Sequence, residues 1–209
     1  MKIKSLLFAA LATLLLSACG DNGKPSEGKE YSVITNPISA DKIAPVTEVF
    51  SLSCGHCRMM EDVIPAIEKG TQQNVSKVHV TFNESAMFAA LLYYSAALQA
   101  DGKPDPALTA ALFKYVQEEQ TESPDKNKEV ITALFEKYGL TSPYTLTDAQ
   151  QNALFKALEK ADEVTEQAEI ESVPTFIVNG KYVVNTAEHD SVEKLISTLN
   201  YLLNTPPAK

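Results

Sequence analysis

The sequence contains no tryptophan, one arginine and three cysteines among its 209 residues. Lysine and arginine together number 18 against 27 acidic residues, so the formal net charge is −9 at pH 7. Proteins that bind nucleic acids need a basic surface to contact phosphates, so this shortage of positive charge argues against a nucleic-acid partner. An acidic, well-hydrated surface is the simplest explanation of the composition.

Motifs that mark several other classes of protein are also missing. The chain has no phosphate-binding G-x-x-x-x-G-K-[ST] loop, no G-x-G-x-x-G, no H-E-x-x-H and no G-x-S-x-G. A closed zinc site generally needs four ligands, and the chain offers a single close pair of cysteines with only His56, His79 and His189 to assist. We therefore expect no metal and no cofactor.

The N-terminal apolar run, Ser5 to Leu16, is too short to span a bilayer comfortably and has the length of a secretory signal. It ends in Leu16-Ser17-Ala18-Cys19, which resembles the lipoprotein box of bacteria, in which the cysteine is lipidated. An ordinary signal peptide is the alternative, although bulky Leu16 would then stand where a small residue is expected. We predict a lipoprotein signal peptide over 1–18 and a lipidated tether over 19–30, and Gly20 slightly favours the outer membrane over the inner.

Lipidation of Cys19 leaves one pair of cysteines, in the motif Cys54-Gly55-His56-Cys57. A structural disulfide this short would add little stability, because the stabilisation from loop closure falls with ring size. The pair therefore indicates exchange of disulfides with other proteins.

The position of this motif predicts a different role for each cysteine. The β-rich run from Val46 to Ser51 precedes Cys54, and a helical stripe follows it. Unpaired N–H groups at a helix N-terminus favour a thiolate, and a protonated His56 would favour it further. We therefore expect Cys54 to be the acidic nucleophile, and Cys57, one turn further on and less exposed, to be the resolving thiol.

The remaining pattern predicts the order β, α, β, helical block, β-hairpin, α. Asn179-Gly180 between two β-rich runs is a strong hairpin signal, and 83–174 shows helical stripes without a convincing strand. The fold class is therefore α/β, a thioredoxin-like fold with an inserted helical domain. We expect one domain over 31–203, followed by a tail at 204–209. Its first part should hold an edge strand at 31–34, a strand at 46–51, a helix at 54–69 kinked by Pro65, and a strand at 75–82 with Val78, Val80 and Phe82 on one face. The insertion should follow at about 83–172, and the last helix at 191–203.

Two segments together resemble the DsbA family of bacterial thiol–disulfide oxidoreductases, over about residues 29–203. The first segment holds Phe50-Ser51, Cys54, His56-Cys57 and Glu61, and the second holds Val173-Pro174 before Val178-Asn179-Gly180-Lys181-Tyr182. The resemblance implies that the Val173–Pro174 bond is cis, faces the disulfide and helps to bind the substrate backbone.

The resemblance also implies roles for Glu48 and Lys77. In the family an acidic residue and a lysine at these places lie buried beneath the redox pair and take part in its proton chemistry. Residues 48 and 77 would otherwise be expected to face solvent. The chain departs from the family at Gly55, where the familiar enzyme has proline, so the redox potential and the membrane partner are open.

The function expected from these features is that of a periplasmic, membrane-anchored thiol oxidase that donates the Cys54–Cys57 disulfide to exported proteins with free thiols. A DsbB-type membrane oxidase is the partner expected to reoxidise it. Two alternatives stay open. One is a disulfide isomerase or reductase of the same compartment, and the other is a lipoprotein binding module without redox turnover.

Overall fold

The computed structural model describes residues 24–205. Their strands form one five-stranded sheet in the order β1-β5-β4-β2-β3. Strand β2 pairs in parallel with β3 and antiparallel with central β4, and β5 pairs antiparallel with β4 and β1. The bounds are β1 (Tyr31–Val33), β2 (Val46–Phe50), β3 (Val75–His79), β4 (Thr175–Val178) and β5 (Tyr182–Asn185).

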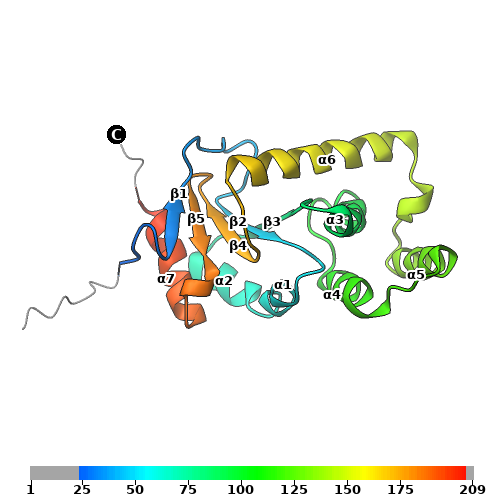
Figure 1. Ribbon diagram of the computed structural model, residues 1–209, viewed down its shortest axis with the longest axis horizontal. Coiled ribbons are helices and arrows are strands. Elements are labelled where there is room, and N and C mark those ends of the chain that lie inside the picture. Colours follow the sequence, from blue (N-terminus) through cyan, green and yellow to red (C-terminus); the bar gives the residue numbers. More distant parts are fainter. Residues whose placement is uncertain (1–23, 206–209) are drawn as a thin grey trace, which may run out of the picture.

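Helices cover both faces of the sheet (Figure 1). Helices α2 (Ile64–Thr71) and α7 (Val192–Leu203) pack on one face, and α6 (Asp148–Gln167) packs on the other. Alternate residues of β4 follow this division, because successive side chains of a strand point to opposite faces. Phe176 lies in the cluster with Leu199, whereas Ile177 lies in the cluster with Val164. The two-sided cover explains why every residue of β2 is buried.

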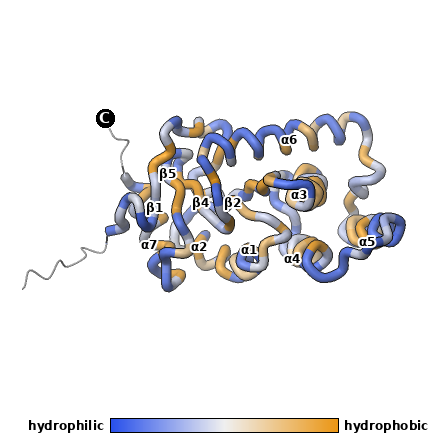
Figure 2. Tube along the Cα trace, viewed as in Figure 1, coloured by the Kyte–Doolittle hydropathy of each residue, from blue (hydrophilic) through white to orange (hydrophobic). Residues whose placement is uncertain are grey.

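A helical insertion separates β3 from β4. Helix α3 is its centre, with nine of its 14 residues buried, and it is largely hydrophobic in Figure 2. Long α6 returns the chain from the insertion to the sheet (Figure 1). The arrangement confirms the predicted α/β, thioredoxin-like fold with an inserted helical domain. The insertion comprises α3 (Glu84–Ala97), α4 (Pro106–Lys114), the π-helical turn η1 (Tyr115–Glu119), α5 (Pro124–Lys137), the 3₁₀ turn η2 (Pro143–Thr145) and α6.

The predicted hairpin is confirmed at Asn179-Gly180, which joins β4 to β5. Both residues have positive φ, 52° and 64°, as a two-residue turn of this kind requires. A Cβ at position 180 would lie 2.1 Å from the carbonyl oxygen of Ile38. Glycine is therefore needed there for space as well as for conformation.

The kinked helix expected over 54–69 is wrong in detail. The chain forms two helices, α1 (Gly55–Met60) and α2, separated by a turn over 61–63. Pro65 is in the first turn of α2, where its missing N–H has no partner to lose. The proline thus starts a helix instead of bending one.

The predicted strand over 75–82 is too long. β3 ends at His79, and Asn83 caps the start of α3 by accepting the N–H of Ala86 at 3.0 Å. Phe82, expected on the same face as Val78 and Val80, is 53% exposed, because the chain turns toward that cap. Three apolar residues within the helical stripes expected over 83–174 are exposed as well: Met87, Leu98 and Val130.

The predicted signal peptide and Cys19 lie outside the described residues, as does most of the C-terminal tail. Residues 26–30, assigned to the tether from composition, form a hydrogen-bonded turn in which Gly28 N–H donates to the Tyr31 carbonyl at 2.8 Å. Within 24–205, no helix combines the length and the apolar character that crossing a bilayer requires.

Candidate active site

Cys54 caps the N-terminus of α1. Its φ and ψ are −92° and 117°, and its Sγ accepts the backbone N–H of Cys57 at 3.1 Å. Cys54 is half-buried and Cys57 is fully buried, and both thiols are free in the structure. The strand-to-helix connection therefore presents one sulfur to the surface and keeps the other beneath it, as the motif predicts.

The surroundings of Cys54 favour its thiolate. The hydrogen bond from the Cys57 thiol is the largest cause, and it acts with the N–H groups of Cys57 and His56 and the charge of His56 to lower the pKa of Cys54 to about 6. The same thiol–thiol contact, together with burial, raises the pKa of Cys57. The two sulfurs are thus strongly unequal: at neutral pH Cys54 carries the negative charge and Cys57 keeps its proton.

The Val173–Pro174 peptide bond is cis, which confirms the expectation. The Cys54 Sγ lies 3.5 Å from the Val173 carbonyl oxygen, so two segments 119 residues apart in sequence meet at the reactive sulfur. Thr186 on the other side of the loop donates its hydroxyl to the Pro174 carbonyl at 2.6 Å. This contact ties the proline loop to the segment that follows β5.

Glu48 and Lys77 stand opposite each other in the parallel pairing of β2 with β3. Glu48 is fully buried and forms an ion pair with Lys77, whose ammonium also contacts Glu61 at 2.6 Å. Both residues therefore lie inside the protein, as the resemblance implies.

The protonation of this buried pair is finely balanced. Burial raises the pKa of Glu48 to about 7, although the charge of Lys77 opposes the rise. Burial also acts to lower the pKa of Lys77, but the carboxylates of Glu48 and Glu61 outweigh it and the net change is upward. A carboxyl that titrates near neutral pH beneath a redox pair is suited to proton transfer.

His56 lies exposed within α1, and its charge is one of the causes of the acidic Cys54. His79, the last residue of β3, is fully buried. Its Nε2 accepts the N–H of Leu52 at 2.9 Å, and its Nδ1 lies 2.7 Å from the Val80 carbonyl, so Nδ1 carries the proton. Burial lowers the pKa of His79 to about 4 and keeps the ring neutral.

Gln117 is a contact of the redox loop that sequence reasoning missed. Its Nε2 donates to the carbonyl oxygens of Leu52 at 2.8 Å and Cys54 at 3.2 Å. Gln117 belongs to η1, 63 positions after Cys54, and a glutamine in a polar helical turn gives no sequence signal of such a contact.

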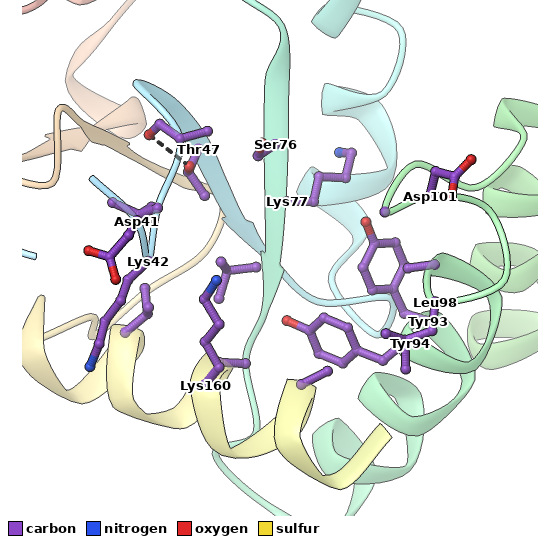
Figure 3. Close-up of a pocket in the computed structure, with 18 of the residues that line it drawn as sticks. Asp41, Lys42, Thr47, Ser76, Lys77, Tyr93, Tyr94, Leu98, Asp101 and Lys160 are labelled. Carbon is purple, nitrogen blue, oxygen red and sulfur yellow. Dashed lines mark hydrogen bonds between the residues drawn. The ribbon is translucent and has the colours of Figure 1, made fainter. Parts of the chain in front are cut away.

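A cavity of about 710 Å³ opens between the sheet, α3 and α6 (Figure 3). Lys77, Tyr93 and Tyr94 line it, but Cys54 and Cys57 do not. The cavity therefore reaches Lys77 of the buried charge pair without reaching the two cysteines. Among residues 24–205, no group of three His, Cys, Asp or Glu side chains is placed to hold a metal ion.

The family model and the curated relatives that match this chain agree on its family. The family model described as Thioredoxin matches residues 35–198. The curated thiol:disulfide interchange protein DsbA of Escherichia coli (strain K12) is 28% identical over 210 residues, covering 94% of this chain and 97% of that protein.

Solved structures share the fold. A variant of Pseudomonas aeruginosa DsbA superposes with a TM-score of 0.66 at 19% identity, covering 86% of this chain and 97% of that chain. Proteus mirabilis DsbA with a non-covalently bound peptide, PWATCDS, superposes with a TM-score of 0.64 at 21% identity, covering 87% of this chain and 100% of that chain.

Proposed function

Because the chain belongs to the thioredoxin family and is a thiol–disulfide oxidoreductase similar to DsbA proteins, we propose that it acts as an oxidant that donates the Cys54–Cys57 disulfide to exported proteins in the periplasm. The observation that carries the direction is the site of Cys54, where the Cys57 thiol and helix N–H groups lower the thiol pKa to about 6. A stabilised thiolate favours the reduced protein and makes its disulfide a stronger oxidant.

The proposed reaction has two exchanges. A substrate thiolate attacks the Sγ of Cys54 in the disulfide, a mixed disulfide forms, and Cys57 leaves as a thiolate that takes up a proton. A second substrate thiolate then attacks the substrate sulfur of the mixed disulfide, and Cys54 leaves as a thiolate. The substrate loses two electrons and gains a disulfide, and the protein gains the two electrons as a dithiol.

Glu48 is proposed as the proton donor to Cys57 in the first exchange. Ionisation of Cys54 raises the pKa of Glu48, so the charges of the redox pair and of the buried carboxyl are coupled. Lys77 holds the carboxylate that remains, and the cavity beside Lys77 and Tyr93 gives this pair a route to solvent.

Val173 and Pro174 are proposed to bind the substrate backbone beside Cys54. The Val173 carbonyl lies 3.5 Å from the reactive sulfur, so an extended peptide that pairs with it would bring its own cysteine to Cys54. The bound peptide in the Proteus mirabilis protein of the same fold is consistent with peptide recognition.

Equilibration of the purified domain with glutathione tests the proposed direction. We expect a potential closer to about −180 mV than to about −120 mV, and far above about −270 mV. A potential at or below about −270 mV would exclude the role of oxidant and favour that of reductase. Thiol trapping in cells gives an independent answer, because an oxidant is held mostly as the disulfide and an isomerase or reductase mostly as the dithiol. Loss of that oxidised pool on deletion of a DsbB-type membrane oxidase would identify the reoxidising partner.

Anchoring by a lipid on Cys19 is part of the proposal, with the outer membrane slightly favoured over the inner. Its support is the Leu16-Ser17-Ala18-Cys19 sequence and the absence of a pairing partner for the third cysteine. Cys19→Ser should abolish acyl labelling and move the protein from the membrane fraction to the soluble periplasmic fraction. Labelling that persists in this variant would overturn the assignment of the lipid to Cys19, and an absence of labelling in the wild type would indicate an ordinary signal peptide.

A further inference from the structure

The loop that carries Cys54 is held from the helical insertion as well as from the sheet. Gln117 in η1 donates one amide group to two carbonyl oxygens of that loop, those of Leu52 and Cys54. On the sheet side, His79 accepts the N–H of Leu52. The N–H and the carbonyl oxygen of Leu52 are therefore both hydrogen-bonded, each to a segment that is distant in sequence.

The orientation of the Gln117 amide is determined by its neighbours. The two carbonyl oxygens can only accept, so the NH₂ end must face them. Arg58, the only arginine in the chain and the residue after Cys57, donates its Nη1 to the Gln117 Oε1 at 3.4 Å and to Glu118 at 2.5 Å. Arg58, in the last turn of α1, therefore binds the oxygen end of the same amide.

The π-helical turn explains how Gln117 reaches the loop. Helix α4 ends at Lys114 and continues directly into η1, where Gln120 N–H donates to Tyr115 O at 3.0 Å. A π turn adds one residue to the helical turn, which rotates the following side chains by about 100° relative to an α-helix. The η1 turn contacts α1 through Arg58 and the redox loop through Gln117, so this rotation bears directly on the redox loop.

We propose that Gln117 is a positioning residue of the redox site, oriented by Arg58, through which the helical insertion holds the backbone around Cys54 in the geometry that favours its thiolate. Two effects follow from the contacts. The amide donors offset partial negative charge on the Leu52 and Cys54 carbonyl oxygens of the redox loop, and they hold Cys54 in the capping conformation that aims the Cys57 N–H at Sγ.

The proposal rests on Cys54 being the reactive thiol, as proposed above. Gln117→Met keeps the length of the side chain and removes both donors. We expect the acid dissociation constant of Cys54, followed by thiolate absorbance in the reduced protein, to fall about three- to tenfold. We expect the equilibrium constant for reduction of the disulfide by glutathione to fall in the same direction, because the thiolate contributes to the stability of the reduced form.

Gln99 is the matched control. Its Nε2 also donates to two backbone carbonyls, Ser95 at 2.7 Å and Thr141 at 3.0 Å, but inside the insertion and away from the cysteines. Gln99→Met should lower the melting temperature to an extent comparable with Gln117→Met and leave both Cys54 readouts unchanged. Arg58→Met should shift them about twofold, and Arg58→Lys, which keeps a cationic donor, should restore most of the wild-type value.

A Cys54 dissociation constant that stays at the wild-type value in Gln117→Met would overturn the proposal, as would an equal shift in Gln99→Met. If Gln117→Met fails to fold, the Arg58 variants decide, since Arg58 is partly exposed and its removal leaves the core intact. A wild-type protein that does not exchange with glutathione would overturn the proposed function instead. The thiolate titration would still decide the role of Gln117.

Discussion

The loop between β2 and α1 is held on its two sides by different chemistry. On the sheet side, a fully buried carboxylate, Glu48, pairs with Lys77, and buried His79 binds the loop backbone. On the insertion side the contacts are a neutral amide, Gln117, and an ion pair between Arg58 and Glu118 whose side chains are 38% and 51% exposed.

The difference between the two sides lies in the cost of removing one partner. When a buried charge loses its counterion, water cannot solvate the charge instead. The free energy of unfolding should therefore respond strongly to mutation and to pH on the sheet side. Exposed ion pairs are hydrated and contribute little, so the insertion side should act on the geometry of Cys54 more than on stability.

The largest expected effect comes from removing the resolving thiol, Cys57. Cys57→Ala should reduce disulfide donation to the background level, and mixed disulfides through Cys54 should accumulate, because the resolving thiol is gone. Gel analysis without reductant would measure this after mixing with a disulfide-containing protein, whose disulfide the Cys54 thiolate attacks, releasing one thiolate of that protein. Cys54→Ala is the control and should trap nothing; complexes formed through Cys57 in that variant would reverse the assignment of the two roles.

Loss of Lys77 should be the largest effect on stability. Lys77→Met leaves Glu48 buried without its cation and should lower the free energy of unfolding by about 3–5 kcal/mol above pH 7, measured by urea denaturation. Lys114→Met, which breaks an exposed pair with Glu119, should cost far less stability, because water solvates both partners. Equal losses in the two variants would contradict the contrast between the buried and the exposed side.

The pH dependence of stability should separate Glu48 from His79. The pKa of Glu48 is raised by burial to about 7 in the folded protein, so its contribution is present below the unfolded value and is lost as pH rises through 7. The pKa of His79 is lowered by burial to about 4, so its contribution is lost as pH falls from the unfolded value of 6.5 toward 4. The two slopes oppose each other in the wild type.

Glu48→Gln should unmask the His79 slope. We expect unfolding free energy in this variant to rise between pH 4 and 6.5, by at most about 1.4 kcal/mol for each pH unit, where the wild type changes less. Denaturant titrations at a series of pH values would measure it. Identical pH profiles for the two proteins would mean that Glu48 does not titrate in this range.

The smallest predicted change is a shift of redox potential at Gly55. A Cβ at this residue would meet no atom within 4 Å, and Gly55 is the first residue of α1, a position that suits proline. Gly55→Pro should therefore fold normally and move the potential upward, by up to the roughly 60 mV that separates about −180 from about −120 mV. Glutathione equilibration of both proteins would measure it, and no shift would place control of the potential outside the intervening pair.

Local sequence signals were enough for much of the fold. The sheet and the insertion could be located from the β-rich runs, the Asn179-Gly180 turn and the helical stripes, because these patterns depend on neighbouring residues along the chain. The errors fell where local signals compete. Pro65 predicts a kink or a helix start equally well, and Phe82 continues an apolar alternation although Asn83 ends it with a cap.

Residue types and their spacing along the chain establish the chemistry: two cysteines three positions apart after a β-rich run, and a Val-Pro pair far along the chain. The surroundings of these residues follow from the packing of the fold. The pairing register set Glu48 against Lys77, and a π-helical turn aimed Gln117 at the Leu52 and Cys54 carbonyls. Such contacts join residues between 29 and 65 positions apart, and no local periodicity records them, because they follow from how packed elements meet in space.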